Sequence, residues 1–142
     1  MGHDAVVDNR GVPRPIYTDP EIAAVGLTER EAREQYGDDV LTGVFPWAAN
    51  ARAVMQNETA GWVKSIHERR YGELLGLVMV GPHVTDLIEA GVVALDAEAT
   101  VETVADGMAA HPTLSEAIKE AGLVALGRPI HLPPRRRAPA QA

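Results

Sequence analysis

The sequence predicts an α+β domain, with a mainly antiparallel sheet of about four to five strands and helices packed on it. Three observations favour this class. The 142 residues are enough for one domain with a single core but too few for two full-sized domains. Strand-like apolar runs dominate the first half of the chain and helical spacing the second half. The expected elements also alternate too little for a doubly wound parallel sheet.

Composition and charge exclude several classes of function. The net charge of −7, with a basic cluster only at residues 135–137, argues against a nucleic-acid partner. No apolar stretch approaches the roughly 18–20 residues that span a bilayer, and the start of the chain lacks an apolar signal sequence, so no membrane partner is expected. The absence of cysteine excludes disulfides and thiolate chemistry within this chain. We therefore expect a cytoplasmic protein.

The ends of the chain differ in composition from its centre. Residues 1–14 contain Asp, Asn, Gly and Pro and predict a linker or a non-native lead-in. Residues 128–142 are rich in Pro, Arg and Ala and predict a flexible tail after Gly127. The domain itself is therefore placed at residues 15–127.

β-Branched residues and continuous apolar runs predict four strands. The run at residues 74–80 is apolar throughout, which is typical of a central strand, and residues 69–72 predict a hairpin to the strand before it. Residues 50–59 break the strand pattern. The expected strands are 22–26, 39–49, 61–69 and 74–80.

Capping signals and helical spacing of apolar residues predict four helices. Thr28 and Glu31 match a capping box at the start of a mostly solvated helix that ends before Gly37. The helix that begins near Val84 carries an apolar stripe that should pack on the sheet. Small residues along the last helix permit close approach of another element. The expected helices are 28–36, 84–99, 100–108 and 114–125.

The segment with the most chemical potential is residues 109–117, in which a histidine precedes a proline just before the last expected helix. Pro112 restricts the backbone of His111 and raises the chance of a cis bond. Thr113 and Glu116 match a capping box, in which each side chain binds the backbone N–H of the other residue. A histidine fixed beside a carboxylate can act as an acid/base pair, and the plainer interpretation is a surface histidine next to a helix cap.

Four further histidines are scattered along the chain, at His3, His67, His83 and His131. Their spacing does not match that of metal ligands, so no metal site is predicted. Each is interpreted as an ordinary surface or loop residue.

Four segments stand in an order and spacing that resemble a known family. They are Ile-Tyr-Thr-Asp-Pro-Glu-Ile-Ala-Ala-Val-Gly at 16–26, Gly-Trp-Val-Lys at 61–64, Leu-Gly leading to Val-Gly-Pro within 75–82, and His-Pro-Thr-Leu-Ser-Glu at 111–116. Together they resemble the C-terminal interface, or dimerisation, domain of the flavin-dependent pyridine nucleotide-disulfide oxidoreductases, most closely the dihydrolipoyl dehydrogenases. The resemblance runs from about residue 12 to about residue 127. Residues 50–53 also match a recurrent segment of the family and are interpreted as structural.

This resemblance implies one part of a larger homodimeric enzyme. In the family, the complete chain adds an FAD domain, an NAD domain and a redox cysteine pair that passes electrons between a dithiol substrate and the cofactor. This sequence has no Gly-x-Gly-x-x-Gly fingerprint and no cysteine. The resemblance therefore implies a fragment that binds no cofactor by itself, is inactive alone, and acts with the FAD and NAD domains of its parent chain.

The resemblance also assigns roles to three residues. His111 corresponds to the family's acid/base, which takes a proton from a dithiol such as a lipoyl group so that a thiolate can attack the disulfide. Glu116 corresponds to the carboxylate that orients this imidazole. In the family the histidine acts across the dimer interface, and the backbone of His111 and Pro112 approaches the partner subunit's flavin.

Other interpretations stay open at this point. Ala109 stands where dihydrolipoyl dehydrogenases often carry a second histidine, which leaves the substrate class undecided. Glutathione reductase-like relatives share His-Pro-Thr, whereas mercuric reductase-like relatives carry a C-terminal cysteine pair that this chain lacks. A free-standing homodimerisation module without catalytic activity is the alternative from another class of protein.

Overall fold

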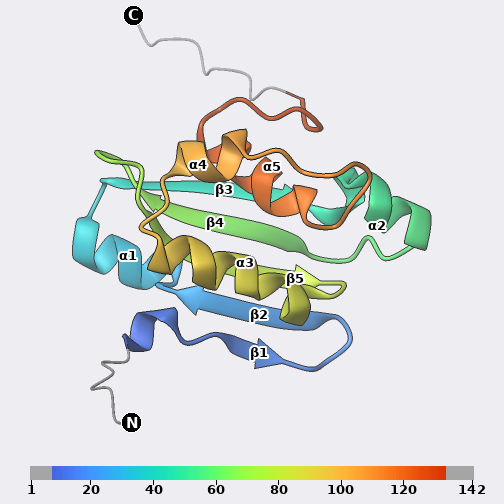
Figure 1. Cartoon of the computed structure of the whole chain (residues 1–142), viewed down its shortest axis with the longest axis horizontal. Helices are drawn as coiled ribbons and strands as arrows, with labels where there is room; N and C mark the ends of the chain where they lie inside the picture. The colour runs from blue at the N-terminus through green and yellow to red at the C-terminus, as the bar shows by residue number, and fades with distance from the viewer. Residues whose placement is uncertain (1–7, 134–142) are drawn as a thin grey trace, which may run out of the picture.

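A computed structural model of the chain describes residues 8–133, which form one five-stranded sheet with helices packed against it (Figure 1). The strands lie in the order β1-β2-β5-β4-β3, and every neighbouring pair is antiparallel. The predicted α+β class is therefore confirmed. The strands are β1 (Arg14–Ile16), β2 (Glu21–Gly26), β3 (Val40–Pro46), β4 (Trp62–Glu68) and β5 (Leu74–Gly81).

Two of the helices share one face of the sheet. In Figure 1, α3 lies over β2 and β5, whereas α5 lies over β3 and β4. The helices are α1 (Glu29–Tyr36), α2 (Ala51–Gln56), α3 (Val84–Asp96), α4 (Val101–Asp106) and α5 (Glu116–Ala125), with 3-10 turns η1 (Asn9–Gly11) and η2 (Trp47–Ala49). Within residues 8–133, no helix combines the length and the apolar character needed to cross a bilayer.

The main core fills the space between the sheet and these two helices. Strand β2 alternates, so that Ala23 and Val25 are fully buried while Ile22 and Ala24 on the opposite face are only half-buried. This alternation defines which face of the sheet receives the helices. The buried core residues are Ala23, Val25, Phe45, Trp47, Ala53, Val63, Leu77, Met79, Val84, Ile88, Ala117 and Ala121.

Helix α1 forms a smaller apolar cluster, in which its Ala32 joins Val40 and Ile66. Its start is fixed by the predicted capping box: the Thr28 side chain accepts the Glu31 N–H at 3.3 Å, and Glu31 Oε2 accepts the Thr28 N–H at 2.8 Å. The predicted helix is therefore confirmed. Its start can be predicted from the sequence because both capping residues lie within four consecutive residues.

Two short elements depart from the sequence-based expectation. Residues 14–16, at the edge of the expected linker, form β1 and pair with β2. The strand expected to reach residue 49 ends at Pro46, and the following break contains helix α2. Asn50 caps this helix by accepting the Ala53 N–H at 2.9 Å, and Asn57 ends it in the left-handed region. A helix of six residues is too short to show apolar periodicity.

Trp47 anchors the turn that joins β3 to α2. Its ring is fully buried, and its Nε1–H donates to the Val80 carbonyl at 2.7 Å. The ring lies so close to Gly81 that a Cβ at that position would meet Nε1 at 2.0 Å. The η2 turn is therefore fixed to the end of β5.

Gly43 sets the distance between β3 and α5, because a Cβ at Gly43 would meet the Ala121 carbonyl oxygen at 1.8 Å. We expect Gly43→Ala to lower the free energy of unfolding by about 3 kcal/mol, the upper part of the range for overpacked sites. Urea unfolding of the chain measures this loss. In the matched variant Gly107→Ala the nearest contact would be the Thr103 carbonyl oxygen at 3.3 Å, and the cost should stay below about 1 kcal/mol. Equal losses in both variants would contradict the close approach of α5.

Candidate active site

His111 and Glu116 form a hydrogen-bonded pair at the start of α5. Nδ1 of His111 lies 2.9 Å from Oε1 and 3.2 Å from Oε2 of Glu116. The His111 side chain is 59% exposed, whereas that of Glu116 is 13% exposed. The peptide bond between His111 and Pro112 is cis. The structure therefore presents an imidazole at the surface with a mostly buried carboxylate beneath it.

Glu116 also holds the backbone of the same turn, but the predicted capping box is only half formed. Its Oε2 accepts the Thr113 N–H at 2.8 Å, as expected. The Thr113 hydroxyl instead donates to the Ala110 carbonyl at 2.7 Å, because the helix begins two residues later than a box at Thr113 requires. Ser115 occupies the N-cap position with helical dihedrals and makes no side-chain cap.

The charge state of Glu116 follows from its partners. Partial burial acts to raise the pKa of Glu116, but the Thr113 N–H, the hydrogen bond with His111 and the charge interactions with His111 and His131 outweigh it, so this pKa is lowered. The ionised carboxylate then accepts the Nδ1–H of His111. This tautomer leaves Nε2 as the ring nitrogen available for proton exchange.

A second histidine–glutamate pair lies beside the first. Nδ1 of His131 lies 2.8 Å from Oε1 of Glu120, which is 2% exposed. Glu120 is one helical turn beyond Glu116 on α5, so the two carboxylates share a face of the helix. The rings of His111 and His131 are nearly parallel, at 4°, with centroids 6.4 Å apart.

The described part of the predicted tail, residues 128–133, contacts α5. Glu120 Oε2 accepts the N–H groups of Ile130 at 3.3 Å and of His131 at 3.4 Å, and Leu132 packs against the main core. The interpretation of His131 as an ordinary surface or loop residue therefore missed this pair. The predicted flexibility of residues 134–142 lies outside the described residues.

Asn50 joins the N-terminus of α2 to the His111 segment. Its Nδ2 donates to the Thr113 carbonyl at 3.0 Å, while its Oδ1 caps α2. The side chain is buried. The sequence predicts only a structural role for Asn50, because no local signal links two positions so far apart in the chain. The one local signal for α2 is Asn50 itself, because asparagine is a favoured N-cap residue.

The other histidines are not part of this cluster. The interpretation of His67 as a surface or loop residue is wrong, because its ring is fully buried on β4, next to an irregularity in the pairing with β5. His83 is exposed at the start of α3, and His3 lies outside the described residues. Across residues 8–133, no group of three or more potential ligands is arranged to hold a metal ion.

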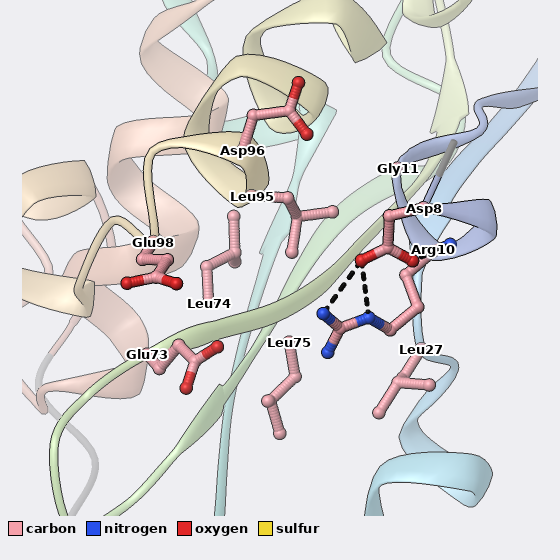
Figure 2. Close-up of a pocket in the computed structure, with 10 residues that line it drawn as sticks. All are labelled: Asp8, Arg10, Gly11, Leu27, Glu73, Leu74, Leu75, Leu95, Asp96 and Glu98. Atoms are coloured by element: carbon pink, nitrogen blue, oxygen red, sulfur yellow. Dashed lines mark hydrogen bonds and ion pairs between the residues drawn. The ribbon is translucent and has the colours of Figure 1, made fainter. Parts of the chain in front are cut away.

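A separate hollow of about 180 Å³ lies where η1 meets the start of β5 and the end of α3. Figure 2 shows its lining residues, with Arg10 bound to Asp8 through hydrogen bonds of 2.8 and 3.0 Å. Neither His111 nor Glu116 lines this hollow. The histidine–glutamate pair is thus a surface site and does not belong to this hollow.

Comparison with known proteins agrees with this fold. Residues 12–122 match the family described as "Pyridine nucleotide-disulphide oxidoreductase, dimerisation domain". The chain therefore belongs to this family of dimerisation domains.

The most informative relatives are dihydrolipoyl dehydrogenases. The chain is 43% identical over 130 residues to one from Bacillus subtilis, with 92% of this chain and 28% of that enzyme covered. It is 46% identical over 121 residues to another from Rhizobium etli, with 85% of this chain and 25% of that enzyme covered. The chain thus spans about a quarter of the length of these relatives.

Solved structures of related enzymes also match this fold. The crystal structure of LpdA from Mycobacterium tuberculosis matches with a TM-score of 0.76 and 34% identity, covering 83% of this chain and 26% of that one. The HOCl-induced flavoprotein disulfide reductase RclA from Escherichia coli matches with a TM-score of 0.73 and 29% identity, covering 78% and 25%.

The buried imidazole of His67 should make stability depend on pH. Burial lowers the pKa of His67 from 6.5 to about 4, so the unfolded chain takes up this proton at a higher pH than the folded chain does. Its stabilising contribution is complete above pH 6.5 and is lost as the pH falls towards 4. The full loss amounts to about 3 kcal/mol.

The measurement is urea unfolding of the wild type and of His67→Leu between pH 7 and pH 4.5. The Gly72 backbone lies near the His67 ring, but neither ring nitrogen makes a hydrogen bond of good geometry among the described residues, so an apolar replacement should be tolerated and should flatten the curve. The control His83→Gln changes an exposed imidazole and should keep the wild-type slope. A full wild-type slope in His67→Leu would contradict the assignment.

Proposed function

We propose that this chain is the interface domain of a homodimeric, FAD-containing and NAD-dependent dihydrolipoyl dehydrogenase-like oxidoreductase. In this proposal it supplies His111 as the acid/base to the active site of the partner subunit, and Glu116 orients that histidine. The carrying observation is the exposed imidazole of His111 held at Nδ1 by the ionised carboxylate of Glu116. The cytoplasmic location inferred from the sequence stays part of this proposal.

The chemistry of the pair suits proton exchange with a thiol. Nε2 of His111 takes the proton from an S–H group of a dithiol such as a lipoyl group, which leaves a thiolate as the nucleophile for a disulfide. The carboxylate of Glu116 stabilises the imidazolium that forms, and it keeps the ring in the tautomer that accepts at Nε2. The proton returns from Nε2 in the reverse direction.

The cofactors fit this site only as groups held by other polypeptide. The His111 side chain is 59% exposed and thus accessible to another subunit, and the chain contains no cysteine to form the redox disulfide. FAD bound elsewhere in the parent enzyme would carry the electrons from the dithiol to NAD. Such an arrangement makes the FAD and NAD domains of the parent chain and a second subunit the partners of this domain.

An apolar hollow provides a surface for the second subunit. A cavity of about 340 Å³ opens between α3 and the α4–α5 pair and is lined largely by small side chains of α3 together with Val104 and Ile118. Val93 at its rim is 60% exposed. A second copy that covers this region would bury apolar surface that a monomer leaves in water.

The first test replaces His111 by Gln in the complete enzyme that carries this domain. We expect dithiol-dependent NAD reduction at pH 7 to fall by about 10²- to 10⁴-fold, the range for loss of a general acid/base. The variant His83→Gln, which changes an exposed histidine outside the pair, should retain activity. Undiminished turnover of His111→Gln would rule out the acid/base role. The 142-residue chain alone should show neither flavin absorbance nor turnover.

The second test concerns the dimer. We expect Val93→Glu to weaken self-association of the chain by at least about tenfold, because a carboxylate would be placed in an apolar contact. Sedimentation velocity over a concentration series measures the dissociation constant. Val54→Glu on α2 introduces the same charge at another exposed valine and should leave it unchanged. A dissociation constant that does not respond to Val93→Glu would place the interface elsewhere.

A further inference from the structure

We propose that Asn50 is a positioning residue of the His111 site, whose side-chain amide holds the turn on which Glu116 binds the imidazole. Its effect on turnover rests on the proposed function. Its effect on the turn does not, since that effect follows from contacts within the domain.

Both ends of the Asn50 amide are engaged, each with a different element. Oδ1 accepts the Ala53 N–H at 2.9 Å, and Nδ2 donates to the Thr113 carbonyl at 3.0 Å. An N–H requires an acceptor and a carbonyl requires a donor, so these two partners fix the orientation of the amide. Because the Asn50 side chain is buried, water cannot replace either partner, and the amide is held in one orientation.

The bond to Thr113 is the sole hydrogen bond that ties residues 108–115 to another part of the described chain beyond α5. The other hydrogen bonds of this segment join His111 to Glu116 and Thr113 to Ala110, Ser115 and Glu116, or form the first turn of α5. The apolar contact of Leu114 with the core adds packing but no fixed direction. Asn50 is thus the polar link between this segment and the rest of the domain.

The backbone of Asn50 is itself held, through Trp47, by hydrogen bonds that reach the sheet, so its side chain starts from a fixed position. Its backbone N–H donates to the Trp47 carbonyl at 2.9 Å, and the buried ring of Trp47 is hydrogen-bonded to Val80 at 2.7 Å. A connected path of hydrogen bonds and buried side chains therefore runs from β5 through Trp47 and Asn50 to the turn at Thr113.

The two polar groups of the Thr113 backbone are held from different sides. Asn50 binds its carbonyl, and Glu116 Oε2 binds its N–H. The same carboxylate binds Nδ1 of His111 through Oε1. Loss of the Asn50 donor should let the backbone on both sides of the Thr113 Cα move, and this movement weakens the contact between the Thr113 N–H and the Glu116 carboxylate beneath His111.

The decisive variant is Asn50→Asp, which keeps an acceptor for the Ala53 N–H but removes the donor to Thr113. Asn50→Ser is the second variant, since a serine also caps a helix but is too short to reach Thr113. Thr28→Ala is the matched control: it removes the cap of α1, at a similar cost in stability, without touching the His111 segment.

The readout is amide hydrogen exchange of the 142-residue chain by NMR. In both Asn50 variants we expect exchange of the Thr113 N–H to accelerate about tenfold relative to the wild type, while the Ala53 N–H stays protected. In Thr28→Ala the exchange rate of the Thr113 N–H should rise no more than the loss in the free energy of global unfolding accounts for. Wild-type protection of Thr113 in both Asn50 variants would overturn the inference.

A second measurement separates this inference from the proposed function. In the complete enzyme, Asn50→Asp should lower kcat for dithiol-dependent NAD reduction about tenfold with little change in the KM for NAD, and Glu116→Gln should add less in this background than alone. If His111→Gln removes activity but Asn50→Asp does not, the positioning role is wrong. If Thr113 exchange accelerates while His111→Gln stays fully active, the positioning of the turn stands and the proposed function is wrong.

Discussion

The arrangement of the site depends on one carboxylate with two different donors. Glu116 uses Oε2 for the Thr113 N–H and Oε1 for His111 Nδ1, so a single side chain links the turn to the ring. Its own position is set by α5, which lies against β3 at van der Waals distance because residue 43 has no side chain. The direction in which the imidazole points therefore depends on the packing between a helix and a strand.

Local signals account for the parts of the fold that the sequence predicts well. The α1 capping box, the continuous apolar run of β5 and the helical spacing of α3 each lie within one element, and each appears in the structure. By contrast, β1 is defined by its pairing with β2, and α2 is too short to be periodic. The burial of His67 does not follow from the sequence, because it depends on which face β4 presents after the irregular pairing with β5.

The candidate site likewise contains residues that the sequence predicts and residues that it does not. His111 and Glu116 are close in sequence and could be named from it, but the partial capping box could not, since the start of α5 is decided by the turn that precedes it. Asn50 and His131 reach the site from other segments of the chain. Their contribution depends on tertiary contacts, for which a single sequence contains no local pattern.

The burial of Glu120 changes where this domain ends in physical terms. The residues that donate hydrogen bonds to it, Ile130 and His131, lie beyond Gly127, where the sequence pattern places the end of the domain. A chain shortened to residue 127 would remove these donors from a side chain that is 2% exposed when they are present. Residues 128–132 thus cover the Glu120 side chain and supply its hydrogen bonds, and an isolated version of this domain has to include them to keep this contact.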